Sequence, residues 1–506
     1  MRYLSLAGFV VVAGAVAAFA CGDGDSLKTG PSAGDAGEAG AHAGGGSAGT
    51  AASGGKGGKG GNGGNAGKGG SAGTAAEAGA PMGGTSGEGG EAAGGDAGAG
   101  GEPQAPNSLK ITLNGVPVGS TASVSIAGPA GFVENISAST TLADVVAGTY
   151  TITAPSIRVP GTQVDSIFDA TVVGGPVEVV LGAAATASVN YARRPGTGML
   201  WGTNYSSPKV FGFDAATIAK TGTQSGPPSV VNTLTNVGTN KPPSPTIAFS
   251  ATGDLWVGTC RKDQIPQVVA KFSPAKLSAT GNPVADVTLT LPATDTTYDC
   301  ADALVFDAAG NLWVGMNHGH ILSFNASDLT VTGTPAPAVN LTSSAYFVGV
   351  LDLAFDSSGN LFVASYGTPI ISRLSASQLL ASDPAVVPAV RLTLAASVGP
   401  GGLVLDKDGS LWVSQYNAKS IVKLSAADLG TTGTPTPALT LTGVPGPEQL
   451  AFDNAGNLWV AAFDAGSVIA LSAVDITTGG SKTPLTALDN DTIDVAFGLR
   501  FNPGAP

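Results

Sequence analysis

The chain has 506 residues, a formal net charge of −13 and a charged fraction of only 12%. Its 23 Lys and Arg are outnumbered by 36 Asp and Glu, which disfavours a nucleic-acid partner because phosphate binding needs clustered basic residues. The acidic composition with 75 glycines instead suits a solvated protein outside the cytoplasm.

Residues 1–20 have the pattern of a secretory signal peptide. Arg2 supplies a positive start, residues 4–18 form an apolar run too short to span a bilayer comfortably, and small residues precede Cys21. This segment resembles the lipobox of bacterial lipoproteins, which implies that Cys21 is lipidated and becomes the new N-terminus. The alternative is an ordinary secretory signal with an incidental cysteine. The resemblance predicts a protein lipid-anchored in the bacterial cell envelope, at the outer membrane or cell surface.

Residues 21–106 are mostly Gly, Ala and Ser with scattered charges. No stretch of this segment can bury enough apolar surface to offset chain entropy, so we expect a disordered linker. A Gly-rich coil of ~85 residues spans roughly 50 Å, which would lift the folded part off the membrane.

Residues 107–194 contain short alternating runs broken by turn residues, which predicts a small β-sandwich. The expected strands lie at 110–113, 122–126, 148–153, 177–181 and 186–191. The run 141–153 resembles one motif of prealbumin-like or carboxypeptidase-regulatory-like bacterial domains. This unit has no His or Cys and few carboxylates, so we expect a spacer and not a catalytic domain.

Residues 195–506 repeat one phrase: an apolar strand, a turn that ends in Gly, and a strand of the form Asn-Leu-Trp-Val. The aromatic residue of the phrase recurs every 47 to 57 residues, at Trp256, Trp313, Phe362, Trp412 and Trp459. Each copy continues with two further strands, so each predicts one four-stranded blade of a β-propeller. Two fragments, around Trp201 and at 499–504, complement each other and predict a sixth blade closed by the C-terminal strand.

The turns of the phrase carry recurrent aspartates at Asp307, Asp356, Asp406 and Asp453. We expect these side chains to cap their turns by accepting backbone hydrogen bonds, with the turn glycines at φ > 0. Calcium ligation is the alternative, and it is disfavoured because the aspartates recur at the edge away from the channel mouth. The tryptophans are expected to pack between adjacent blades.

The loops at the opposite edge should share the mouth of the central channel. The fourth position after each blade aromatic falls there, as does a short His-containing loop. The candidate binding face therefore comprises Tyr205, His318, His320, Tyr366, Tyr416 and Phe463. Cys260 and Cys300 meet on the same face, and in an oxidising compartment they can form a disulfide.

The blade phrase at 409–417 is similar to repeats of the NHL, streptogramin-lyase-like and SMP-30/gluconolactonase-like six-bladed families. Gluconolactonase-like enzymes hold a divalent metal in the channel mouth with a Glu before one first strand, and Glu448 falls at a comparable place. Asp302 and Asp352 also precede first strands, so these three carboxylates are the candidate ligands of a divalent metal such as Ca²⁺. The alternative is that they are solvated or cap loops. For the general-base His of streptogramin-lyase-like enzymes, the mouth offers His318 and His320.

Two classes of function stay open. The favoured one is a non-catalytic propeller, displayed by a surface or periplasmic lipoprotein, that binds a protein, glycan or peptide. The alternative is a metal-dependent hydrolase or lyase of the gluconolactonase-like or streptogramin-lyase-like kind. Too few titratable groups converge in the pattern to assign a catalytic residue.

Overall fold

The structure, a computed structural model, describes residues 106–161, 166–205, 207–234, 246–260, 266–293, 300–395 and 399–504. The predicted signal peptide, Cys21 and the glycine-rich linker lie outside the described residues. The chain divides into two compact units, and every described residue belongs to the unit that contains 104–506. Across the described ranges, no helix combines the length and the apolar character needed to cross a membrane.

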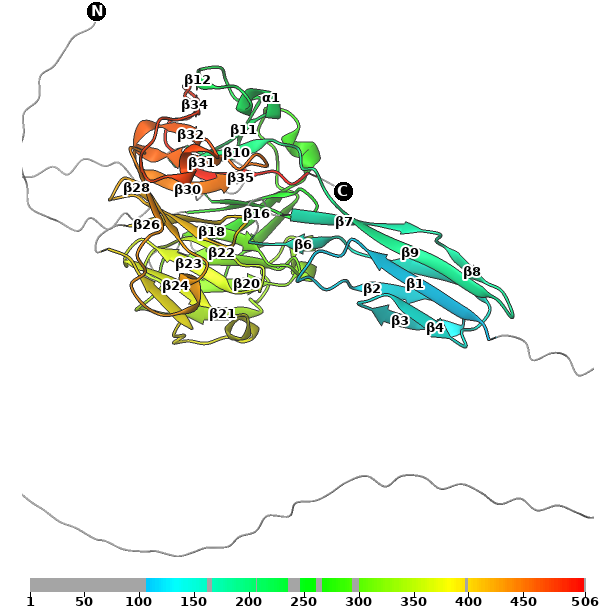
Figure 1. The fold of residues 1–506 in the computed structure, drawn as a ribbon. Helices are drawn as coiled ribbons and strands as arrows, with labels where there is room; N and C mark the ends of the chain where they lie inside the picture. Colours follow the sequence, from blue (N-terminus) through cyan, green and yellow to red (C-terminus); the bar gives the residue numbers. More distant parts are fainter. Residues whose placement is uncertain are drawn as a thin grey trace, which may run out of the picture. The chain divides into compact units, whose positions relative to one another are not determined.

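Residues 106–194 fold as two sheets that share one core (Figure 1). The first sheet has the order β4-β1-β9-β7-β6 and the second β3-β2-β5-β8. In β5, Tyr150 and Ile152 are buried while the residues between and around them are more exposed, which is the period of a half-buried strand. The elements are β1 (Ser108–Asn114), β2 (Val124–Ala127), η1 (Pro129–Gly131), β3 (Val133–Ile136), β4 (Thr140–Ala143), β5 (Gly148–Thr153), β6 (Ile157–Val159), β7 (Ser166–Val173), β8 (Val177–Val179) and β9 (Ala184–Arg193).

The rest of the described chain forms six four-stranded blades of a β-propeller (Figure 1), which confirms the predicted all-β fold class. From the inner to the outer strand, the blades are β35 (Ala496–Phe501), β10 (Leu200–Asn204), β11 (Lys209–Phe213), β13 (Val230–Thr233); β14 (Ile247–Phe249), β15 (Leu255–Gly258), β16 (Val268–Phe272), β17 (Val287–Thr290); β18 (Ala301–Phe306), β19 (Leu312–Met316), β20 (His320–Phe324), β21 (Val339–Thr342); β22 (Val350–Phe355), β23 (Leu361–Ser365), β24 (Ile370–Leu374), β25 (Val390–Thr393); β26 (Pro400–Leu405), β27 (Leu411–Gln415), β28 (Ser420–Leu424), β29 (Leu439–Thr442); and β30 (Pro447–Phe452), β31 (Leu458–Ala462), β32 (Ser467–Leu471), β34 (Thr486–Leu488).

Short elements decorate the outer edges of the blades. β12 (Gly222–Gln224) pairs in parallel with β34, and β33 (Gly480–Ser481) pairs in parallel with β29. The helical turns are α1 (Ala215–Ile218), η2 (Pro274–Leu277), η3 (Ala326–Thr330), η4 (Ala376–Leu380), η5 (Asp428–Gly430), η6 (Phe463–Ala465) and η7 (Asp475–Thr477). Because β12 and β33 pair with outer strands, they leave fewer raw sheet edges on the rim.

One blade is assembled from both ends of the propeller region. The C-terminal strand β35 runs antiparallel to β10, with Leu200 opposite Phe501 and Trp201 opposite Arg500. The inner strands then neighbour one another in the order β35, β14, β18, β22, β26, β30 and back to β35. The ring is therefore closed by hydrogen bonds between segments about 300 residues apart in sequence.

The repeated phrase places a tryptophan beside the aspartate that starts the preceding turn. In three blades the indole N–H donates to that aspartate. The bond is 3.0 to 3.1 Å long and joins Trp313 to Asp307, Trp412 to Asp406 and Trp459 to Asp453. Backbone N–H groups of Asp408 and Ser410 also donate to Asp406 Oδ1 at 3.0 Å, which confirms the predicted capping of the turn. The indole partner explains why aspartate and tryptophan recur together.

Each of these aromatic residues also packs across the boundary between blades. The ring of the tryptophan meets the edge or face of the phenylalanine near the end of the next inner strand, with centroids 5.9 to 6.4 Å apart. The pairs are Trp201 with Phe249, Trp256 with Phe306, Trp313 with Phe355, Trp412 with Phe452 and Trp459 with Phe501. This confirms the predicted role in blade packing, and the edge-to-face geometry is the favourable one.

The β-sandwich covers the end of the channel on the turn side. Arg158 of β6 is 5% exposed, donates from Nη1 to the Phe249 carbonyl at 2.9 Å, and stacks on the Phe306 ring at 5.3 Å. Gly161 follows with φ of 71°, and a Cβ there would lie 2.5 Å from the Phe355 carbonyl oxygen. Only glycine permits this approach. Among the described residues, the β-sandwich contacts only this end of the channel.

Ring closure gives a first prediction. Deleting residues 498–506 removes most of β35 and exposes the edge of β10, so we expect aggregation or loss of a single cooperative unfolding transition. Calorimetry of the truncated and full-length chains measures this. Unchanged melting of the truncated chain would show that the ring does not depend on β35.

Candidate binding site at the channel mouth

A cavity of about 430 Å³ opens at the channel mouth. This volume lies within the usual range for sites that bind small organic ligands. Its lining comes from the starts of inner strands and from the loops that follow second strands, which are the two kinds of segment that meet at this face. A smaller cavity of about 110 Å³ lies at the other end of the channel, beside Arg158.

One wall of the mouth cavity is aromatic. Tyr366, Tyr416, Phe463 and Tyr205 come from four successive blades at the fourth position after the blade aromatic, and all four line the cavity. Neighbouring ring centroids are 6.4, 5.7 and 5.4 Å apart along this series, so the rings form a continuous wall. Phe497 joins it, with its centroid 5.8 Å from that of Tyr205. The structure thus gathers the four aromatic residues of the predicted binding face.

Glu448 reaches this cavity because its strand is bulged. Pro447 pairs with Ala462 and Leu450 pairs with Val460, so two residues of β30, Glu448 and Gln449, face a single residue of β31. A β-bulge of this kind re-aims side chains at the end of a strand. Comparable shifts of register occur near the mouth in β18, β22, β26 and β35.

A glycine pair on the neighbouring inner strand makes room for Glu448. A Cβ at Gly401 would lie 2.8 Å from Glu448 Oε2, and a Cβ at Gly402 would lie 2.5 Å from the Glu448 carbonyl oxygen. Real Cβ atoms do not tolerate such distances, so both positions require glycine while the glutamate stays in place. The glycine pair therefore leaves the space that the Glu448 side chain and backbone occupy.

The Glu448 carboxyl is buried without compensation. The residue is 5% exposed, and Oε2 receives no hydrogen bond from any residue that the structure describes. Burial raises the pKa of Glu448 to about 8, and the negative charges of Asp464 and Asp352 contribute in the same direction. A carboxyl in this condition exchanges its proton close to neutral pH, or accepts a cation that enters the cavity.

Asp464, next in sequence to Phe463 of the aromatic wall, is compensated. Lys419 Nζ is 2.9 Å from Asp464 Oδ2, and the Tyr416 hydroxyl donates to Asp464 Oδ1 at 2.9 Å. The bond from Lys419 lowers the pKa of Asp464, so this carboxylate stays ionised. Burial and the bond to Asp464 raise the pKa of the Tyr416 phenol, which keeps that hydroxyl protonated as a donor. The Tyr366 hydroxyl is held similarly by Asn417 Oδ1 at 3.1 Å.

Asp352 crosses the channel to meet Arg500. The two residues belong to inner strands on opposite sides of the ring, and Arg500 Nη2 donates to Asp352 Oδ1 at 2.8 Å. Backbone N–H groups of Leu353 and Leu403 also donate to the carboxylate, each at 2.9 Å. Burial raises the pKa of Asp352, and Arg500 and both N–H groups oppose that shift. This carboxylate is engaged in holding three strands together.

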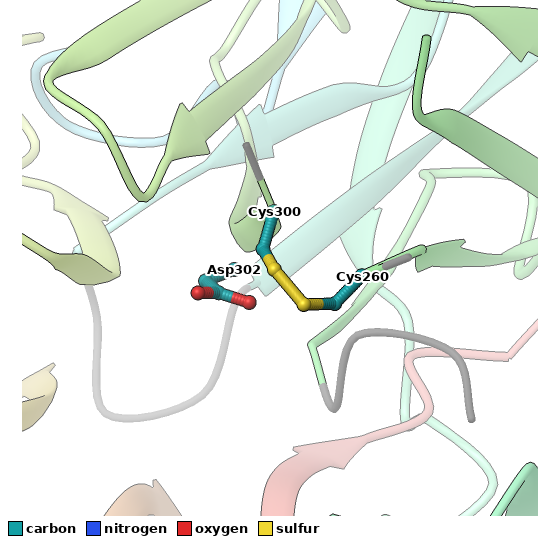
Figure 2. Close-up of side chains that lie close together, drawn as sticks. All are labelled: Cys260, Cys300 and Asp302. Atoms are coloured by element: carbon teal, nitrogen blue, oxygen red, sulfur yellow. A yellow bond between two sulfur atoms is a disulfide. The ribbon is translucent and has the colours of Figure 1, made fainter. Parts of the chain in front are cut away.

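Asp302 is also engaged, next to the disulfide. Cys260 and Cys300 are bonded to each other across 40 residues of sequence, with Asp302 beside them (Figure 2). The Asn317 side-chain amide donates to Asp302 Oδ2 at 2.9 Å. Within the described ranges, Cys260, Cys300 and Asp302 are the only three acidic, Cys or His residues whose ligand atoms lie within 4.8 Å of one another. Since both sulfurs are in the disulfide, this group does not form a metal site.

The described residues therefore do not gather Glu448, Asp302 and Asp352 into one ligand set. Each of the two aspartates has partners of its own, and a Ca²⁺ ion needs six to eight oxygens.

The two predicted histidines lie in different surroundings. His318 lines the mouth cavity, whereas His320 Nδ1 is 3.1 Å from Asn340 Oδ1 between the third and fourth strands of its blade.

Sequence reasoning missed Phe497 and Phe347 in the cavity lining. The sequence did carry a signal for Phe497. It stands two residues before Leu499, just as Glu448 stands two residues before Leu450. The register of the repeats therefore predicts that the side chains of Phe497 and Glu448 have the same orientation. Phe347 lies in the connection before β22, which differs in sequence from the other copies. Its place in the cavity follows from the tertiary structure alone.

No protein-family model matches the chain, and no curated protein matches it. Among solved structures, a streptogramin B lyase has a TM-score of 0.39 at 12% identity, over 60% of this chain and 87% of that one. A selenomethionine-substituted virginiamycin B lyase from Staphylococcus aureus has a TM-score of 0.36 at 12% identity, over 55% and 79%. A protein of unknown function from Bacteroides caccae has 0.40 at 10% identity, over 60% and 97%. The fold is assigned from the sheet topology of this chain. The candidate binding site is assigned from the cavity and from the contacts of its lining residues.

The cross-channel ion pair gives a second prediction. Arg500→Gln leaves Asp352 buried without its cation, so we expect the free energy of unfolding to fall by about 3–5 kcal/mol. The second substitution Asp352→Asn should restore part of that loss, because no unpaired charge remains. Denaturant unfolding of the wild type, both single variants and the double variant measures the coupling. Strictly additive effects would mean that the pair contributes nothing of its own.

The raised pKa of Glu448 gives a third prediction. Between about pH 5 and pH 8 the folded state holds a proton that the unfolded state has released, so stability should fall as pH rises. The slope is at most about 1.4 kcal/mol per pH unit, and it should end above the folded pKa. We expect Glu448→Gln to lack this component, which denaturant unfolding at several pH values measures. Glu134→Gln, on the exposed strand β3, is the control and should keep the wild-type slope. Parallel curves for wild type and Glu448→Gln would contradict the prediction.

Proposed function

We propose that this chain is a binding protein whose propeller captures a small organic ligand, or an exposed group of a protein, glycan or peptide, in the mouth cavity. The observation that carries the proposal is the cavity of about 430 Å³ with a continuous aromatic wall and one uncompensated buried carboxyl. Aromatic rings with a few placed polar groups are the usual lining of a ligand site. The far end of the channel is covered by Arg158 and Gly161, so the ligand enters from the mouth.

The proposal includes the setting of the propeller. The signal-like residues 1–20, Cys21 and the glycine-rich segment 21–106 support a lipid-anchored protein of the bacterial envelope whose folded part stands away from the membrane. The disulfide between Cys260 and Cys300 supports an oxidising compartment. A mouth cavity at the free end of such a tether is accessible to ligands outside the cytoplasm.

One observation favours a second candidate, a hydrolase or lyase. Glu448 and His318 line the same cavity from opposite sides of the ring, and the pKa of Glu448 is raised to about 8, which suits a general base near neutral pH. The binding function is preferred because the other carboxylates near the mouth are engaged by Arg500, Lys419 and Asn317.

Filling the cavity tests the binding function and gives a fourth prediction. Val348 lines the cavity and is 42% exposed, so Val348→Trp should occupy the mouth without burying a larger side chain in the core. Fragments that bind the full-length wild type in ligand-observed NMR should lose binding to this variant.

Val331→Trp is the control, because Val331 is 66% exposed and does not line the cavity. Fragments that bind wild type and both variants equally, or no binding at all, would contradict the proposed function. Conversion of a bound fragment to a product would favour the hydrolase or lyase instead.

A further inference from the structure

We infer that the ligand of the mouth cavity is an organic cation, whose primary or methylated ammonium group contacts the Glu448 carboxylate and the aromatic wall. This inference rests on the binding function proposed above and adds the chemical class of the ligand. It follows from one juxtaposition: a 95% buried carboxyl with a partnerless oxygen, Oε2, in a cavity walled by aromatic rings.

Among the described residues, one carboxyl at the cavity has no cation beside it, and it becomes a negative group once it loses its proton. Asp352 is paired with Arg500 at 2.8 Å, and Asp464 is paired with Lys419 at 2.9 Å. Glu448 forms no ion pair within the part of the chain that the structure describes, and its Oε2 receives no hydrogen bond. Buried charges in proteins are normally paired, so a cation from outside completes this site.

The aromatic wall is suited to the same charge. The faces of aromatic rings carry partial negative charge and attract ammonium groups, most strongly where water is excluded. Tyr205, Tyr416 and Phe463 present adjacent rings, with centroids 5.4 and 5.7 Å apart and interplanar angles of 68° and 89°. Because neighbouring rings are close to perpendicular, a group in the cavity can contact both ring faces and ring edges.

Other ligand classes fit less well. An anion would be repelled by ionised Glu448 and by nearby Asp464, and no Lys or Arg is among the described residues of the lining. A hard metal ion would find one carboxylate where it needs several oxygen ligands. An ammonium group with methyl or methylene carbons satisfies the carboxylate and the rings together, and the volume of about 430 Å³ leaves room for the rest of the ligand.

Binding should depend on pH, because an ammonium group prefers the ionised carboxylate. Of the strands packed against β30, namely β26, β27, β31 and β35, only β35 carries a charged side chain, Arg500. The negative charges that act on Glu448 are those of Asp352 and Asp464, and the phenols of Tyr366 and Tyr416 lie within its field. Affinity should therefore rise with pH by up to about tenfold per unit and level off above the Glu448 pKa of about 8.

A matched pair of probes tests the charge. Choline and 3,3-dimethylbutan-1-ol have the same shape, but only choline is charged. In NMR titrations of the full-length protein at pH 8.5, we expect choline to bind at least ~tenfold more tightly than the alcohol. Nα-acetyllysine amide, compared with its Nε-acetylated form, tells whether a lysine side chain or a free methylammonium compound is the better ligand.

Single variants test which residues cause the preference for choline over the uncharged alcohol, and this is the fifth prediction. Glu448→Gln should remove most of the preference for choline and its pH dependence, whereas Glu134→Gln should change neither. Phe463→Leu should weaken choline binding more than binding of the alcohol, since only a cation interacts with the ring charge. His318→Gln removes the imidazole of the lining and should leave the pH profile in place. Melting curves confirm that each variant is folded.

The outcomes separate the two proposals. Equal affinities for both members of both probe pairs, in a cavity that still binds fragments blocked by Val348→Trp, would overturn the cation inference and leave the binding function intact. A choline preference that persists in Glu448→Gln would overturn the role of the carboxylate. Absence of any fragment bound at the mouth would overturn the binding function itself.

Discussion

The pairing of β35 with β10 is the constraint on which the rest of the propeller depends. It joins the two ends of the propeller region into one blade, and only a closed ring holds the six inner strands around a common channel. Arg500 of the closing strand then reaches Asp352 on the opposite inner strand, 148 residues away in sequence. Closure therefore fixes the geometry of the mouth as well as the sheet edges, because the cross-channel pair forms only when the last strand is in register.

The two ends of each blade differ in the contacts that their residues make. At the turn side, the repeated aspartates accept hydrogen bonds from the turn and from the blade tryptophan, and each tryptophan packs on the phenylalanine of the next blade. The bond between tryptophan and aspartate forms in three blades, and in a fourth blade Phe362 takes the place of the tryptophan. At the mouth, the equivalent positions carry Tyr205, Cys260, Asn317, Tyr366, Tyr416 and Phe463. The residues at this position differ from blade to blade, and there the disulfide and the aromatic wall join neighbouring blades.

The placement of Glu448 in the candidate site lowers the stability of the fold. A bulge turns it toward the mouth, a glycine pair leaves space for it, and nothing in the described chain compensates its charge. Sequences agree with their folds at most positions, and local violations such as this one concentrate at functional sites. Asp352 and Asp464 are paired with Arg500 and Lys419, so Glu448 is the carboxyl of this group that no described cation pairs.

The sequence by itself determined the period, the four strands of each blade, the turn caps and the two half-copies that close the ring, since these depend on residues near one another in the chain. It also placed Tyr205, Tyr366, Tyr416 and Phe463 at one face, because equivalent positions in a repeat are equivalent in space. The candidate metal ligands show the limit of that reasoning. Asp302, Asp352 and Glu448 lie near the starts of inner strands alike, inside β18, β22 and β30 and not before them as predicted. Only tertiary contacts decided that Asn317 holds the first, Arg500 the second and no described residue the third. The pairing and protonation of a buried carboxyl depend on residues from distant segments of the chain, and a local sequence pattern does not show those residues.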